Sequence, residues 1–378
     1  MTPATSIFLD MMRFTAAFVV LLHHLTSPEI NGVLPHIPYG HEAVVVFFVM
    51  SGFVIAFVLK GRESSAEQYA AARLGRLYSV VVPALCLTFV LDGWGRAASP
   101  QLYSGIPADH PLLRLLINAL FLQQNWNLTV MPLSNGPFWS LGYEFWYYII
   151  FGGWVLLRGR ARLAVVSLAC LAAGPRILAA FPVWLLGALG FRIGLAWQPP
   201  RRLASGLFIL SSVAFLAILV FGNPFLPLRE ALRGGLQDGY FNLGIARIFA
   251  GDIPRFPEDM LLGTAFAVMI MTVSAAWGKR RIPQRGVSLI RYLAGSTFSV
   301  YLFHAPLLYF LVAVIHVDKH AAVELMLVGA LVLASCILLA YVSERQVARY
   351  RRAFLKLFAR LSSIARLVAG QFRFLRAN

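Results

Sequence analysis

The chain has 378 residues, of which 59% are hydrophobic and only 13% are charged, with a formal net charge of +17. A soluble protein of this length would carry about a quarter charged residues, so the composition excludes an ordinary soluble enzyme. Single-residue alternation of apolar and polar residues, typical of a β-barrel, is not seen. The sequence therefore predicts an all-α fold, a polytopic transmembrane helical bundle.

Ten apolar stretches are predicted to cross the membrane: 7–27, 42–60, 75–93, 137–157, 161–174, 177–197, 203–222, 258–278, 291–315 and 321–343. A shorter apolar stretch, 111–124, follows the third. Basic loops lie on the cytoplasmic side of membrane proteins, and the charge pattern obeys this rule only if 111–124 does not cross. We expect 111–124 to be interfacial or re-entrant and both termini to be cytoplasmic. The N-terminus lacks the features of a cleavable signal, so it is expected to remain as the first span.

The first predicted span contains Arg13, His23 and His24. Charged residues are costly inside a membrane and usually functional there. Arg13 and His24 are close to three helical turns apart, so they share one helix face, about 16 Å apart along the axis. His23 points about 100° away. His24 is thus the expected partner of Arg13 in any shared site.

Two further motifs lie on opposite sides of the predicted bundle. Arg73 and Arg76, at the predicted inner side, either hold a phosphate-rich ligand or serve only as positive-inside anchors. On the outer side, residues 123–127 read Gln-Gln-Asn-Trp-Asn. Such amide and aromatic groups suit sugar recognition, and an interfacial aromatic belt is the alternative.

Glu144 is an acid well inside a predicted span. Ser140 and either Tyr147 or Tyr148 share its helix face. An acid in the membrane requires a partner, and a histidine or an arginine from another span is the obvious candidate. Glu144 therefore belongs either to a catalytic site or to an ion pair between helices.

His304 is a second histidine inside a predicted span. Thr297 and Tyr301 lie on its helix face, and Pro306 frees the carbonyl group of Leu302 from its helical hydrogen bond. The histidine either takes part in chemistry or hydrogen-bonds neighbouring helices together.

The charge of the chain is concentrated in short loops and at the C-terminus. Residues 345–378 are predicted to form a basic amphipathic cytoplasmic tail on the anionic inner leaflet, next to a membrane domain at 1–344. Because this pattern follows membrane topology, no nucleic-acid partner is expected. Cys86, Cys170 and Cys336 lie in apolar runs without metal-ligand spacing, so neither a disulfide framework nor a metal site is expected.

Several motifs follow one another in a characteristic order. They are Arg13 with His24, Phe-Phe-x-x-Ser-Gly-Phe at 47–53, Arg73-x-x-Arg76, Trp139-Ser-Leu-x-x-Glu144 and Tyr301-Leu-x-His304. In this set, over about residues 5–345, the chain resembles the acyltransferase-3 family of integral membrane O-acyltransferases. These bacterial enzymes acetylate or succinylate polysaccharides, lipopolysaccharide and other acceptors.

The resemblance implies a role for each of these residues. The implied catalytic residues are His24, Glu144 and His304, the donor-binding residues are Arg13, Arg73 and Arg76, and the substrate-binding residues are Trp139 and Tyr301. His24 would act as a general base on the acceptor hydroxyl or help to relay the acyl group, and a histidine suits this task because its ordinary pKa lies near the operating pH. Glu144 would orient or polarise a histidine, as the third member of a triad does.

The expected reaction is transfer of an acyl group from cytoplasmic acyl-CoA to a hydroxyl of a glycan or glycolipid. Among acyl groups, acetyl is the one expected. The resemblance implies the bacterial inner membrane, contact with its lipids, and partners from polysaccharide biosynthesis. Two departures from the family are noted: the Glu144 block lacks a second acid, and no extracytoplasmic domain is expected after the membrane part. The alternative is a transporter or flippase that uses the same residues as a substrate or proton path. It predicts inverted repeats, which the sequence does not show.

Overall fold

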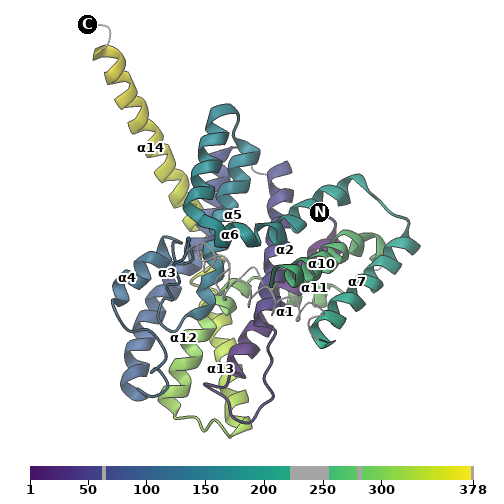
Figure 1. Ribbon diagram of the computed structural model, residues 1–378, viewed down its shortest axis with the longest axis vertical. Helices are drawn as coiled ribbons and strands as arrows, with labels where there is room; N and C mark the ends of the chain where they lie inside the picture. Colours follow the sequence, from purple (N-terminus) through teal and green to yellow (C-terminus); the bar gives the residue numbers. More distant parts are fainter. Residues whose placement is uncertain (62–64, 222–254, 279–282, 376–378) are drawn as a thin grey trace, which may run out of the picture.

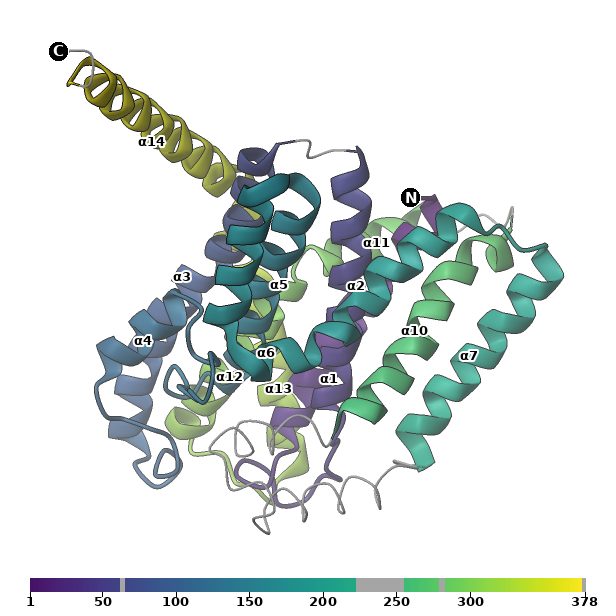
Figure 2. The ribbon, with the colours of Figure 1, turned by 45° about the horizontal axis from the view of Figure 1, so that its top comes forward.

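Helices make up all the regular structure in the residues that the computed structural model describes, namely 1–61, 65–221, 255–278 and 283–375. The prediction of an all-α bundle is confirmed. The α-helices are α1 Pro3–Leu25, α2 Gly40–Gly61, α3 Ala66–Ala98, α4 Pro111–Ala119, α5 Trp139–Leu156, α6 Gly159–Ala196, α7 Arg201–Phe221, α10 Phe256–Trp277, α11 Gln284–Ala294, α12 Thr297–Ile315, α13 Ala322–Leu339 and α14 Val347–Leu375, with 3₁₀ helices η1 Gly136–Phe138 and η3 Glu344–Gln346. Helix α1 packs against α2, α10, α11 and α12, as Figures 1 and 2 show.

Within the described ranges, eight helical stretches are long and apolar enough to cross a membrane. Helix α5 is not among them, because its 18 residues include Glu144 and several tyrosines, tryptophans and glycines. Helix α6 counts once, although it joins the predicted spans 161–174 and 177–197. The number of ten spans and the cytoplasmic termini therefore stay predictions.

The junction inside α6 is a kink that a loop stabilises. Gly174 has φ 80° and ψ 173°, outside the helical region. The side chains of Asn125 and Trp126 donate hydrogen bonds to the carbonyl oxygens of Ala172 and Leu171, each at 2.8 Å. These side chains thus satisfy carbonyl groups at the end of the first arm. Sugar recognition and an aromatic belt both stay predictions for residues 123–127. Figure 2 shows the two arms of α6 diverging at this point.

Two other predicted segments have different limits in the structure. The predicted span 291–315 is divided at Gly295 and Ser296 into the short helix α11 and the apolar helix α12. The stretch 111–124 forms only the nine-residue helix α4. Since crossing takes about 20 residues, α4 is too short to cross the membrane, as expected.

Helices α2 and α6 approach each other unusually closely through glycines. A Cβ atom on Gly52 would lie 2.0 Å from the carbonyl oxygen of Trp184, and one on Gly187 would lie 1.8 Å from that of Val49. Only glycine permits this approach. The contact sets the position of α2, and residues of α2 line the cavities described below.

The start of α5 is tied to α3 and α12. Asp92 accepts hydrogen bonds from the backbone N–H and the hydroxyl of Ser134, at 2.8 and 2.5 Å. Asn135 donates to the carbonyl oxygen of Leu302 at 2.8 Å. This is the carbonyl that Pro306 was predicted to free, and the contact explains how the polar group is satisfied inside α12.

The predicted C-terminal tail contains a long helix, α14, that extends from the bundle in Figure 1. Its first half packs on α3: a Cβ atom on Gly75 would lie 2.8 Å from the backbone nitrogen of Arg351, and the rings of Tyr78 and Phe354 lie 5.7 Å apart. The helix is therefore attached to the membrane domain. Its position relative to a lipid leaflet stays a prediction.

Candidate active site

Residues from α1, α2, α3, α5 and α12 converge on one cavity with about 690 Å³ of space between atoms. We call it the arginine cavity, and the residues that define it are Arg13, Ser51, Arg73, Arg76, Ser140, Glu144, Tyr148, Thr297 and Tyr301. Five of the eight predicted site residues thus share it. They come from parts of the chain almost 300 residues apart, which only the fold brings together.

Three guanidinium groups dominate the charge of the arginine cavity. Arg13 contacts Asp10 at 3.6 Å on its own helix. Arg73 lies over the rings of Tyr69 and Tyr148, with its central carbon 5.7 and 5.8 Å from the ring centroids. Arg76 interacts electrostatically with Arg13 and with Glu144. Because Glu144 is the one carboxylate on the described wall, the cavity is positive and suits an anionic ligand.

Glu144 is held by hydroxyl groups. The hydroxyl of Ser51 donates to its Oε1 at 3.1 Å, and the hydroxyl of Tyr148 donates to the same atom. The structure pairs Glu144 with these groups and with the charge of Arg76, so of the two partners expected from another span the arginine is the one observed. The role of Glu144 towards a histidine stays a prediction.

His24 and His304 form a pair outside the arginine cavity. The Nδ1 atom of His24 lies 3.3 Å from Nε2 of His304, and the ring centroids are 5.0 Å apart. Nδ1 of His24 also lies 2.9 Å from the carbonyl oxygen of Val20, and Nδ1 of His304 lies 2.8 Å from that of Val300. A carbonyl oxygen only accepts hydrogen bonds, so both Nδ1 atoms carry the proton. Nε2 of His24 is left with a lone pair, as a general base requires.

Tyr301 connects the two parts of the site. Its ring lines the arginine cavity, and its centroid lies 6.5 Å from that of His304. Its hydroxyl donates to the carbonyl oxygen of Pro137 at 2.9 Å and accepts from Ser140 at 2.7 Å. The hydroxyl is thus committed to the protein, and the ring is the part available to a substrate.

The loop after α1 adds groups to the histidine pair that sequence patterns did not reveal. The ring of His23 lies 5.0 Å from His24 and 5.1 Å from His36. Glu29 accepts hydrogen bonds from its own backbone N–H and from the side chain of Ser27, and these hold its pKa below the ordinary value. The charge of Glu29 acts on His24 and His36. Glu29 is therefore a carboxylate that acts on His24.

Trp139 lies apart from the arginine cavity. It lines a second cavity together with Tyr143, His41 and Asp259, which we call the outer cavity. Nε2 of His41 lies 2.8 Å from Oδ1 of Asp259. The two cavities share the α2 residues that separate them, including Phe48. No group of three or more His, Cys, Asp or Glu side chains in the described ranges is arranged to hold a metal ion.

Comparison with known proteins gives one family and several relatives. The model of a family described as an acyltransferase domain matches residues 6–344. An O-acetyl transferase of Shigella phage Sf6 is 30% identical over 206 residues, covering 49% of this chain and 60% of the relative. Acyltransferase MdmB of Streptomyces mycarofaciens is 28% identical over 230 residues, covering 55% and 56%.

The exopolysaccharide production protein ExoZ of Rhizobium meliloti is 29% identical over 206 residues, covering 50% of this chain and 62% of the relative. The matched region thus spans less than two thirds of the length of each of these relatives. No solved structure matches the chain.

Proposed function

The chain belongs to the acyltransferase family whose domain model covers residues 6–344, and from this premise we propose that it transfers an acyl group from acyl-CoA to a hydroxyl of a surface glycan. The class of enzyme, a membrane acyltransferase, follows from the family. The donor, the acceptor and the bacterial inner membrane are part of the proposal. The names of the phage O-acetyl transferase and of ExoZ favour an acetyl group and a polysaccharide.

The observation that carries the proposal is the arrangement along α1. Arg13 lines a positive cavity, and His24, about 16 Å further along the helix, presents a free Nε2 atom. A donor with anionic phosphates fits the arginine end. A glycan hydroxyl fits the histidine end, which the charge pattern assigns to the outside.

The chemistry we propose is direct transfer. Nε2 of His24 takes the proton of the acceptor hydroxyl, and the hydroxyl oxygen attacks the thioester carbonyl carbon. The carbon–sulfur bond breaks, an ester forms, and the proton returns from His24 to the departing thiolate. His304 positions His24 by accepting from its Nδ1–H, and Trp139 in the outer cavity offers an aromatic face to the acceptor sugar.

The test uses purified protein in lipid nanodiscs with labelled acetyl-CoA and glycan from the native host. We expect label in the glycan, detected by mass spectrometry, and release of free CoA in equal amount. Glycan movement across proteoliposomes without any acyl donor would support the transporter alternative instead. Failure to consume any acyl-CoA would overturn the proposed donor.

A further inference from the structure

A second positive pocket lies at the end of the bundle where α2 and α5 end and α6 begins. It is lined by Lys60, Arg162 and Arg192, together with the aromatic side chains Phe151, Trp154 and Phe191, and it has about 1240 Å³ of space between atoms, open to solvent. The positive-inside rule assigns this end to the cytoplasm. None of the roles proposed above uses this pocket.

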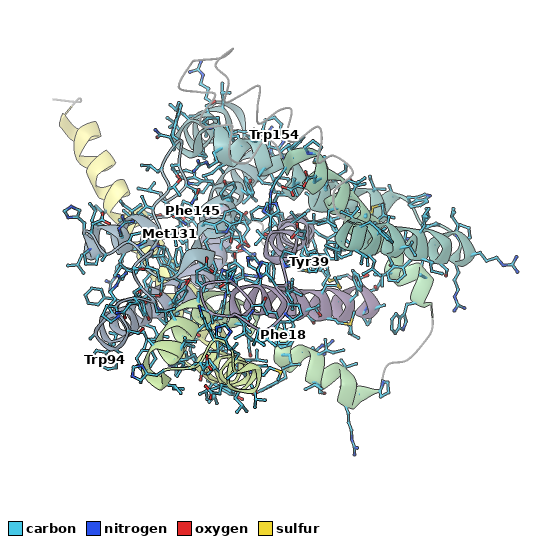
Figure 3. All side chains as sticks on the ribbon, turned by 60° about the horizontal axis from the view of Figure 1, so that its bottom comes forward. Phe18, Tyr39, Trp94, Met131, Phe145 and Trp154 are labelled. Atoms are coloured by element: carbon cyan, nitrogen blue, oxygen red, sulfur yellow. The ribbon has the colours of Figure 1, made fainter. Side chains whose placement is uncertain are left out.

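The lining of the pocket combines charge with an available ring. Its described lining residues include three cations and no acid. Nε of Arg162 donates to the carbonyl oxygen of Leu157 at 2.8 Å, and the guanidinium lies 5.2 Å from the Trp154 ring centroid. Trp154, labelled in Figure 3, is 59% exposed, so the ring face that Arg162 does not cover is open to a planar ligand. Topology alone explains basic residues here, but it does not explain why they surround a pocket with an exposed tryptophan.

The pocket lies next to the arginine cavity along two helices. On α2, Ile55 lines the cavity and Ala56 lines the pocket. On α5, Tyr148 lines the cavity and Phe151 lines the pocket, about one turn away. The two sites are thus about one helical turn apart along α5, a separation that is short compared with an extended ligand.

We propose that this pocket binds the 3′-phosphoadenosine diphosphate end of the acyl donor, while the acyl-pantetheine end reaches the arginine cavity. The adenine stacks on Trp154, and Lys60, Arg162 and Arg192 bind the phosphates. The inference rests on the proposed function, because it takes acyl-CoA as the donor. It adds a site for the nucleotide, a part of the donor that the arginine cavity does not need to hold.

The deciding experiment compares acetyl-CoA with acetyl-pantetheine, which lacks the nucleotide. In Arg162→Ala and Arg192→Ala, KM for acetyl-CoA should rise about tenfold or more, the usual effect of losing one charge-assisted contact. kcat/KM for acetyl-pantetheine should stay within about twofold of that of the unmodified protein. Arg160→Ala is the matched control, since Arg160 is an exposed residue near the start of the same helix and outside the pocket lining.

A second measurement separates this inference from the proposed function. Adenosine 3′,5′-bisphosphate should bind the purified protein, as measured by calorimetry. The single variants Trp154→Ala and Arg162→Lys should each weaken that binding. If acetyl-CoA is consumed but its KM is unchanged in all pocket variants, the pocket assignment is wrong and the proposed function stands. If the unmodified protein uses no acetyl-CoA and the bisphosphate does not bind, both fail.

Discussion

The two ring nitrogens of His24 have different tasks. Nδ1 is committed to Val20 and His304, so only Nε2 is able to accept a proton. We predict that His24→Gln lowers kcat for acyl transfer by about 10²- to 10⁴-fold, the usual contribution of general base catalysis. The measurement is initial rate at saturating donor and acceptor.

The neighbouring histidine provides the control for this prediction. Nδ1 of His23 forms a hydrogen bond with the carbonyl oxygen of Ile37 at 2.9 Å, and the ring of His23 packs against Gly40. His23→Gln should therefore change kcat only a few-fold. Equal losses in the two variants would show that His24 acts through the structure rather than as the base.

Arg76 and Glu144 should depend on each other for stability. Each places a charge in the same cavity, and the charge of Glu144 acts on Arg76. We expect Arg76→Gln and Glu144→Gln each to lower the thermal midpoint in detergent, and the double variant to lose less than the sum of the two. The coupling should be about 0.5–3 kcal/mol. Strictly additive losses would mean that the two charges are independent.

Trp139 should affect the acceptor and not the donor. It lines the outer cavity, away from the three arginines. We predict that Trp139→Ala raises KM for the glycan about tenfold, as expected for a lost aromatic contact, with KM for acetyl-CoA unchanged. Trp94→Ala is the control, because Trp94 is 64% exposed on α3 and labelled in Figure 3 at the periphery. A change in KM for acetyl-CoA instead would place Trp139 on the donor path.

At the scale of whole elements, close helix approach is a vulnerable feature. Gly187→Ala should push α6 away from α2, because the new Cβ atom would meet the carbonyl oxygen of Val49. Overpacking of this kind costs about 1–3 kcal/mol, and it should also lower activity because α2 separates the two cavities. Gly194→Ala, in the same helix with open space around it, should be neutral. Thermal midpoints of the two variants in one detergent decide the point.

The periodicity of apolar residues predicted most helices, but not where they end or which helices pack together. The pattern could not show that α6 bends without ending, because its kink is stabilised by Asn125 and Trp126 from a distant loop. It also extended the predicted span 291–315 across Gly295, since apolar residues on both sides hide a break in the backbone. Element type follows from local sequence, whereas these limits depend on tertiary contacts.

At the scale of the whole molecule, the sequence predicted which residues line the site better than it predicted which of them contact each other. Arg13, Arg73, Arg76, Glu144 and Tyr301 were predicted as site residues, and they share one cavity. The hydrogen bond from Ser51 to Glu144 was not predicted, because a contact between residues 93 positions apart depends on how α2 packs against α5. The cost of a polar group in a membrane marks it as functional and does not say which other group it meets.

The proposed reaction requires a fixed orientation of the bundle. Acyl-CoA is cytoplasmic, so the ends of α2 and α5 must face inward and the loop between α3 and α4 must face outward. In a variant with Cys86, Cys170 and Cys336 replaced by serine, a single cysteine at the exposed position Ser104 should react with a membrane-impermeant maleimide on intact cells. One at the exposed position Arg160 should react only after the membrane is permeabilised. The reverse pattern would put Arg73 and Arg76 on the side without acyl-CoA, and direct transfer from a cytoplasmic donor would then be impossible.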